Sequence, residues 1–171
     1  LPGDANNYLA AVVGSSAGFG IAYADVTTGD FATTELAGPE AMRQELDRLS
    51  PAELIHPDNL ELDEQLPGHR APRPEWQFEP GTAEELLRAH FRVASLEGFG
   101  LGGKPLATMA AGGILAYLTQ NQPTALASLT RLSTYSTADF MVLDAATRHD
   151  LELTETRRTG ALKGSLLGVL D

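Results

Sequence analysis

The sequence predicts an α/β fold: a mixed sheet flanked by helices, followed by a short, mainly helical C-terminal extension. Three observations lead to this class. Hydrophobic residues make up 43% and charged residues 20% of the 171 positions, which is the composition of a globular protein. The chain opens with β-rich runs joined by glycine-containing turns. A helical pattern and another strand pattern follow, which is the order of elements in an α/β domain.

The first strands are expected at Asn7–Val13, Phe19–Thr27 and Phe31–Leu36. Their connections are short and contain glycine, so an antiparallel meander is the simplest arrangement. Along the second run, both alternating sets of side chains are small or apolar. We therefore expect the second strand to be central and covered on both faces.

A helix is predicted over Pro39–Leu49, because apolar residues recur there at helical spacing and Pro39 suits a first helical turn. Pro51 ends it, since proline disfavours helical geometry in the residue before it. The run Ala52–His56 then reads as a strand. A strand that follows a crossover helix is expected to lie parallel to a strand of the meander.

The next segment, Leu60–Pro74, is rich in proline and is interpreted as an exposed loop. Trp76–Phe78 is expected to form a short strand with buried aromatic side chains. Thr82 and Glu85 fit a capping box that opens a helix ending near Phe91. The expected inner face of that helix comprises Ala83, Leu86, Leu87, His90 and Phe91.

A second buried helix is predicted over Pro105–Gln120, which is apolar nearly all round. Its Gly112 and Gly113 would allow a neighbouring backbone to approach closely. The longest apolar stretch, Leu106–Leu118, is well short of the roughly 20 residues of a membrane span. The later run Leu132–Ser136 is expected to be extended.

Charge and cysteine content exclude several kinds of function. The formal net charge of −11 would repel a phosphate backbone, so we expect no non-specific nucleic-acid binding by this chain alone. The absence of cysteine excludes disulfides and thiolate chemistry. We expect a cytoplasmic protein that does not associate with membranes.

A glycine-rich stretch, Gly98–Pro105, has the spacing of a phosphate-binding P-loop up to Lys104, and it lies between a possible strand, Arg92–Leu96, and a helix. The next position should carry a hydroxyl that binds magnesium, and Pro105 has none. The favoured interpretation is a glycine-rich connection before a buried helix.

Asp25 on the second strand resembles the first carboxylate of an RNase H-type, metal-dependent nuclease. Such chemistry needs further carboxylates that converge on the same ions. Glu53, Asp139 and Asp144 are the candidates, and this nuclease is the alternative function that we consider. The four histidines are not paired at metal-ligand spacing, and His90 is interpreted as a core residue.

A resemblance to a known family is carried by separated segments, namely Asn7–Val12, Gly20–Phe31, Leu49–Leu54, Leu96–Leu101, Met141–Leu153 and Gly164–Asp171. Together they resemble the MutS family of bacterial mismatch-repair proteins. The run Met141–Leu153, together with Gly164–Asp171, is similar to the opening of that family's core (lever) domain. Segments similar to its connector domain are Asn7–Val12, Gly20–Phe31, Leu49–Leu54 and Leu96–Leu101. These segments occur in the family's order over essentially the whole chain.

The resemblance implies an RNase H-like connector domain over residues 5–138 and an incomplete core domain over residues 139–171. It implies no enzymatic activity for this chain, and no catalytic, cofactor-binding or metal-binding residue in it. In the family, connectors link the mismatch-binding domain to the core and ATPase domains and relay signals between them. ATP, magnesium and mismatched DNA would be bound by domains with no matching sequence here, in a whole protein that forms a homodimer.

The family resemblance also implies a docking surface for MutL around the helix that begins near Thr82. The polar residues of the family's pattern are not reproduced at this place in the chain, so only the helix face is carried over. The predicted partner-binding residues are Glu84, Glu85 and Arg88.

Overall fold

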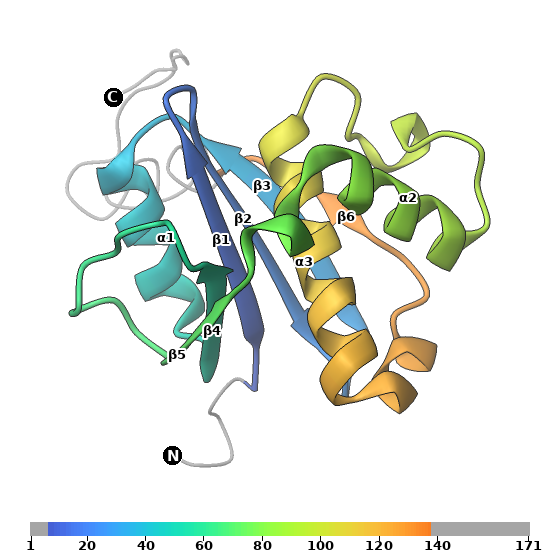
Figure 1. Cartoon of the computed structure of the whole chain (residues 1–171), viewed down its shortest axis with the longest axis horizontal. Helices are drawn as coiled ribbons and strands as arrows, with labels where there is room; N and C mark the ends of the chain where they lie inside the picture. The colour runs from blue at the N-terminus through green and yellow to red at the C-terminus, as the bar shows by residue number, and fades with distance from the viewer. Residues whose placement is uncertain (1–6, 138–171) are drawn as a thin grey trace, which may run out of the picture. The chain divides into compact units, whose positions relative to one another are not determined.

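The computed structural model describes residues 7–137, which form a six-stranded mixed sheet in the order β5-β4-β1-β2-β3-β6 (Figure 1). The predicted α/β class with a mixed sheet is confirmed, and the arrangement is consistent with the RNase H-like fold. The predicted start at residue 5, the boundary at residue 138 and the extension over residues 139–171 lie outside the described residues.

Strands β1 (Leu9–Ser15), β2 (Gly18–Asp25) and β3 (Asp30–Leu36) form the predicted antiparallel meander. Glycine permits the tight β1–β2 turn, because Gly18 has a φ of +139°. In the next turn, the amide of Gly29 donates a 2.8 Å hydrogen bond to the carbonyl oxygen of Asp25.

Helix α1 (Pro39–Leu49) connects the meander to β4 (Glu53–Pro57), which lies parallel to β1 as expected for a strand after a crossover helix. The helix ends at Leu49, and the next residue, Ser50, has a left-handed φ of +46° and directly precedes Pro51. At the other edge, β6 (Ser133–Thr134) lies parallel to β3, within the run that was expected to be extended.

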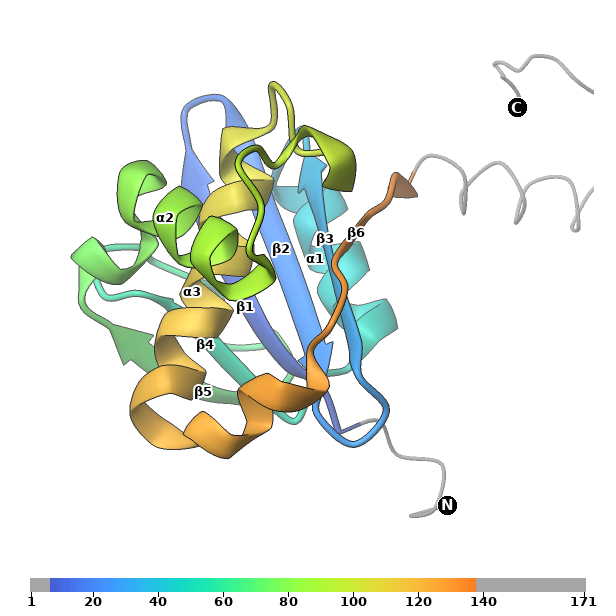
Figure 2. The same ribbon diagram turned by 90° about the vertical axis from the view of Figure 1, so that its right-hand side faces the viewer.

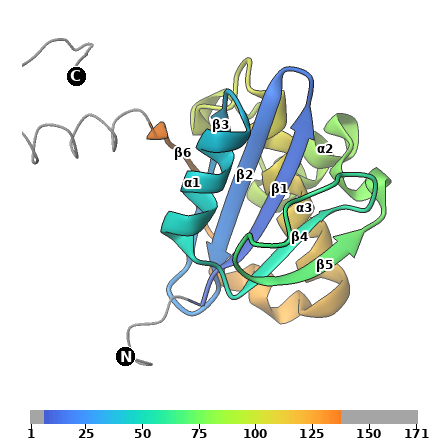
Figure 3. The same ribbon diagram turned by 90° about the vertical axis from the view of Figure 1, so that its left-hand side faces the viewer.

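Helices cover both faces of the sheet, as the side views show (Figures 2 and 3). On one face, α1 packs over apolar side chains that include Val12 and Ile21. On the other face, α3 (Pro105–Asn121) and α2 (Pro80–Phe91) pack over a larger cluster that includes Ala22 and Phe31. The prediction that β2 is central and covered on both faces is therefore confirmed.

The glycines of α3 bring neighbouring elements close to its backbone, as predicted. A Cβ atom on Gly112 would lie 2.3 Å from Cβ of Ala83 in α2. A Cβ atom on Gly113 would lie 2.3 Å from the ring of Phe78. Both contacts are far shorter than a van der Waals separation, so these positions require glycine.

The expected loop over Leu60–Pro74 contains a strand that the sequence analysis missed. Strand β5 (His69–Arg73) pairs in parallel with β4 and forms the edge of the sheet. Pro72 suits an edge strand, where one side of the backbone makes no ladder bonds. Leu66, in the same expected loop, is buried.

Three further local predictions were wrong. Trp76–Phe78 belongs to a 3-10 helix, η2 (Glu75–Phe78), rather than to a strand. Helix α2 begins at Pro80, with Glu79 at its N-cap, so Thr82 lies inside the helix and forms no capping box. Proline favours this earlier start because its φ angle is already helical. The possible strand Arg92–Leu96 does not form, and the short 3-10 helix η3 (Glu97–Phe99) follows these residues and overlaps the start of the glycine-rich stretch.

The described chain is completed by a 3-10 helix, η4 (Pro123–Ser128), which links α3 to β6. The compact unit that contains the sheet extends to Tyr135.

Candidate functional site

The three predicted partner-binding residues lie on the outer side of α2, whose inner side is fixed by the fully buried Ala83 and Leu87. Glu84 and Glu85 are exposed and Arg88 is partly exposed. Nε of Arg88 lies 3.9 Å from a carboxylate oxygen of Glu84, which is an ion pair without a hydrogen bond.

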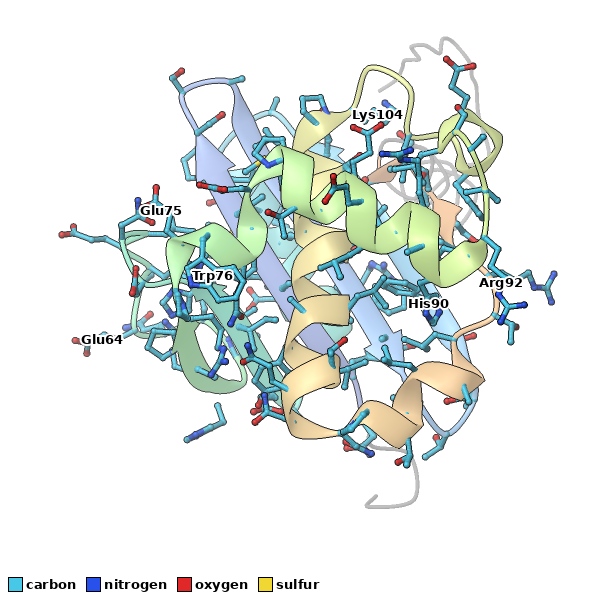
Figure 4. The ribbon with its side chains drawn as sticks, turned by 45° about the vertical axis from the view of Figure 1, so that its right-hand side comes forward. Glu64, Glu75, Trp76, His90, Arg92 and Lys104 are labelled. Carbon is cyan, nitrogen blue, oxygen red and sulfur yellow. The ribbon has the colours of Figure 1, made fainter. Side chains whose placement is uncertain are left out.

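A groove of about 370 Å³ lies beside α2, between this helix and the segment that leads into α3. Pro80 and Glu84 line it from α2, while Glu97, Gly103 and Lys104 line it from the opposite wall. Glu85 is not among its lining residues. The groove carries charges of both signs, and Lys104 is exposed at its rim (Figure 4).

The groove includes most of the glycine-rich stretch with P-loop spacing. The backbone amides at the start of α3, beside the groove, already bind a carboxylate of the protein itself. Oε2 of Glu35 accepts hydrogen bonds from the backbone amides of Leu106 and Ala107, at 2.7 and 3.2 Å. In a P-loop, amides at a helix N-terminus bind phosphate. Here a carboxylate from β3 occupies that position, which supports the interpretation of a structural connection.

Asp25, the centre of the alternative nuclease hypothesis, is bound to its own turn. One carboxylate oxygen, Oδ1, accepts hydrogen bonds from the backbone amide of Thr27 at 2.9 Å and from its hydroxyl at 2.6 Å. Asp25 is buried. This is the local role that aspartate commonly takes at the start of a turn.

The second nuclease candidate, Glu53, lies on the opposite face of the sheet from Asp25. Glu53 and Ala24 are both register partners of Leu9, so these three side chains share the α3 face. Asp25 follows Ala24 along β2, and successive strand residues point to opposite faces. Oε2 of Glu53 also accepts a 2.5 Å hydrogen bond from the hydroxyl of Tyr117 in α3.

The two carboxylates therefore cannot meet at one metal ion. Within residues 7–137, no group of three or more histidine, cysteine, aspartate or glutamate side chains could hold a metal. The other candidates, Asp139 and Asp144, lie outside the described residues. The geometry gives the nuclease hypothesis no support.

His90 is a partly buried residue of the inner face of α2, close to its predicted role. Its Nε2 lies 2.6 Å from the carbonyl oxygen of Leu129. A carbonyl only accepts, so the Nε2–H group donates. The ring thereby ties α2 to the segment that follows η4.

A buried polar cluster near the end of the described chain was not anticipated. Glu45 in α1 is only 4% exposed and pairs with Arg48 at 2.5 Å. The hydroxyl of Tyr135 donates a 2.6 Å hydrogen bond to the same carboxylate. The sequence carried a partial signal, because Glu45 interrupts the apolar face of α1 between Met42 and Leu49.

Trp76 is the second feature that the sequence analysis did not anticipate. It was expected to be buried in a strand, and 54% of it is exposed on η2. Its neighbour Phe78 is buried as expected.

These features define an α/β domain with a mixed sheet, carboxylates engaged in structural contacts, and a charged outer helix. The family model described as MutS domain II matches residues 7–131. The chain belongs to the MutS family of DNA mismatch repair proteins, and its described domain corresponds to domain II.

Individual relatives agree with this assignment. The chain is 41% identical to the DNA mismatch repair protein MutS of Trichodesmium erythraeum, over 97% of this chain and 20% of that protein. It is 42% identical to MutS of Trichormus variabilis, over 100% of this chain and 22% of that protein. For MutS of Syntrophobacter fumaroxidans the identity is 43%, over 96% of this chain and 20% of that protein.

The chain thus spans about a fifth of the length of these curated relatives. Over residues 7–137, no helix is both long enough and apolar enough to cross a membrane.

Proposed function

We propose that this domain is a non-catalytic connector in a MutS-type mismatch repair protein. It would join the mismatch-binding domain to the core and ATPase domains and relay signals between them. ATP, magnesium and mismatched DNA would be bound by those other domains, in a cytoplasmic homodimer. The observation that carries this proposal is the match to MutS domain II over nearly all of the described fold.

The rigidity of the domain supports a relay role. The sheet is covered on both faces, and side-chain hydrogen bonds join elements far apart in the sequence, such as Tyr117 to Glu53 and Tyr135 to Glu45. Such contacts would let the domain move as one body and carry a displacement from one end to the other.

We further propose that the outer face of α2, with Glu84, Glu85 and Arg88, is a docking surface for MutL. The carboxylates of Glu84 and Glu85 are exposed, Arg88 is partly exposed, and the ion pair between Glu84 and Arg88 is long. An exposed pair of this kind contributes at most about 1 kcal/mol to folding. These side chains are therefore free to pair with a partner at little cost in stability.

The test is a binding measurement between this chain and the MutL protein of the same organism. The double charge reversal Glu84→Lys and Glu85→Lys should weaken binding roughly tenfold or more, because like charges replace complementary ones. A matched control, Glu40→Lys with Asp47→Lys, makes the same change in net charge on α1, which covers the other face of the sheet. Equal binding by both double variants and the wild type would refute this docking surface.

A further inference from the structure

Trp76 is the one large hydrophobic side chain that the described part of the chain leaves exposed, at 54%. It lies on η2, the turn that enters α2 directly, with Glu75 beside it (Figure 4). Trp76 is also the only tryptophan in the whole sequence. Tryptophan is among the residues most enriched at the energetic centres of protein interfaces.

The turn that carries Trp76 is firmly anchored in the domain. The next two residues, Gln77 and Phe78, are each only 1% exposed. The ring of Phe78 packs against Gly113 of α3. The side chain of Gln77 accepts a 3.2 Å hydrogen bond from Arg73 and donates one of 3.2 Å to Gln120. The backbone beneath the indole is thus held in place before any partner arrives, which lowers the entropic cost of binding.

Trp76 has acidic neighbours in the sequence, while the nearest cation there, Arg73, is hydrogen-bonded to Gln77. Glu75 and Glu79 flank it in the sequence, and both are exposed. Glu84 and Glu85 continue the negative charge along α2. Exposed carboxylates around an indole favour a partner face rich in arginine or lysine, whose cations also stack on the ring.

The outer face of α2 presents charges and has no apolar centre of its own. Stable interfaces combine a buried apolar or aromatic core with a polar rim. Trp76 supplies that missing core at the start of the same helix.

We propose that Trp76 is the aromatic anchor of the α2 docking surface, and that Glu75, Glu79, Glu84 and Glu85 form its acidic rim. The partner that fits is a protein with a basic face that places an arginine or lysine over the indole. This inference rests on the proposed function, in which the partner is MutL.

The first test measures binding of MutL to the chain and to two variants. Trp76→Ala should weaken binding roughly 30-fold, the effect of losing an interface hot spot, and Trp76→Phe should recover part of it. The side chain is exposed and its neighbours are independently anchored, so the thermal midpoint of Trp76→Ala should match the wild type. Unchanged binding by Trp76→Ala overturns the anchor.

The second test observes the indole directly. Because the chain has one tryptophan, a 5-fluorotryptophan label gives a single fluorine resonance that belongs to Trp76. Unlabelled MutL should shift this resonance and reduce its sensitivity to solvent deuterium. A shift that instead depends on the concentration of the chain alone would show that a second copy covers Trp76, and would overturn the proposal.

The two proposals fail in different ways. If the Glu84/Glu85 reversal weakens binding and Trp76→Ala does not, the α2 face is the docking surface and the anchor is wrong. If neither change affects MutL binding, both proposals are wrong. Loss of binding in Trp76→Ala together with an unshifted fluorine resonance would also overturn the anchor, since the indole would not be in contact with the partner.

Discussion

The hydroxyl of Tyr135 donates a 2.6 Å hydrogen bond to the carboxylate of Glu45, which lies 90 positions earlier in the chain. Glu45 is buried and also pairs with Arg48. The amide of Tyr135 donates a 3.0 Å hydrogen bond to the carbonyl oxygen of Thr33, and its own carbonyl oxygen accepts a 2.6 Å bond from the hydroxyl of Thr34. Tyr135, near the end of the described residues, is thus hydrogen-bonded to both α1 and β3.

Replacing Tyr135 with phenylalanine should reduce the free energy of unfolding by about 1.5–3 kcal/mol, the usual contribution of a hydrogen bond to a charged group. Urea denaturation of the chain would measure the loss. The exposed Glu40 serves as a control, because Glu40→Gln on the same helix should change stability much less than Glu45→Gln. Equal stabilities for Tyr135→Phe and the wild type would contradict a structural role for this bond.

The four tyrosines should lose their phenolic protons at a higher pH in the folded protein than in the unfolded chain. Burial is the largest cause that raises the pKa of Tyr8, Tyr23, Tyr117 and Tyr135 above the ordinary value of 10.0. For Tyr117, burial and the hydrogen bond to Glu53 raise the pKa to about 12.

The pKa of each tyrosine is higher in the folded state than in the unfolded state. The stability that the folded state gains from its neutral tyrosines is therefore fully present below about pH 10. For Tyr117 it should be lost as the pH rises from about 10 through about 12. Phenolate absorbance of the native chain should therefore rise at higher pH than that of the urea-unfolded chain. Coincident titration curves would contradict the prediction, and Tyr117→Phe should remove part of the alkaline destabilisation.

Gly112→Ala should destabilise the domain. The added Cβ would lie 2.3 Å from Cβ and 2.5 Å from Cα of Ala83, so α2 would have to move away from α3. Overpacking costs about 1–3 kcal/mol, partly offset by roughly 1 kcal/mol of helix propensity, so we expect a net loss of up to about 2 kcal/mol.

The matched control is Gly81→Ala in α2, where an added Cβ meets nothing within 4 Å. This change should leave the thermal midpoint unchanged or raise it slightly. If both variants had the same midpoint, close packing of α2 on Gly112 would not limit stability.

The chain should not cleave nucleic acid with a divalent metal. Asp25 and Glu53 lie on opposite faces of the sheet, and each is engaged in a structural hydrogen bond. An RNA–DNA hybrid incubated with the chain and manganese should remain intact, to the same extent as with Asp25→Asn. Cleavage that requires metal and disappears in Asp25→Asn would revive the nuclease hypothesis.

Much of the fold could be predicted because its signals are local. The meander follows from β-rich runs with glycine turns, and α1 and α3 follow from apolar spacing and from proline at their first positions. Strand β5 was missed because its composition, His69-Arg-Ala-Pro-Arg73, resembles a loop. The strand is stabilised by backbone pairing with β4, and this pairing cannot be predicted from the amino-acid composition of the strand itself.

The features of the candidate site were less predictable because they depend on contacts between distant residues. The spacing of α2 placed Glu84, Glu85 and Arg88 on its outer side. Nothing local revealed that Glu35 would reach the start of α3 across 71 positions, or that Tyr135 would bind Glu45. Trp76 was misjudged because an aromatic residue next to Phe78 suggested burial for both, and only Phe78 reaches the core.

Glu35 is the internal anion at the start of α3, and its removal should be measurable in two ways. Glu35→Ala leaves the amides of Leu106 and Ala107 without their carboxylate acceptor, at a cost of about 0.5–2 kcal/mol, as for the loss of an N-cap. Glu97→Ala, an exposed carboxylate of the groove, should cost much less. Added inorganic phosphate should raise the thermal midpoint of Glu35→Ala towards that of the wild type and leave the wild type unchanged, because the freed amides then face an anion again. Equal stabilisation of both proteins by phosphate would show that the ion acts elsewhere, and that the carboxylate does not fill an anion position.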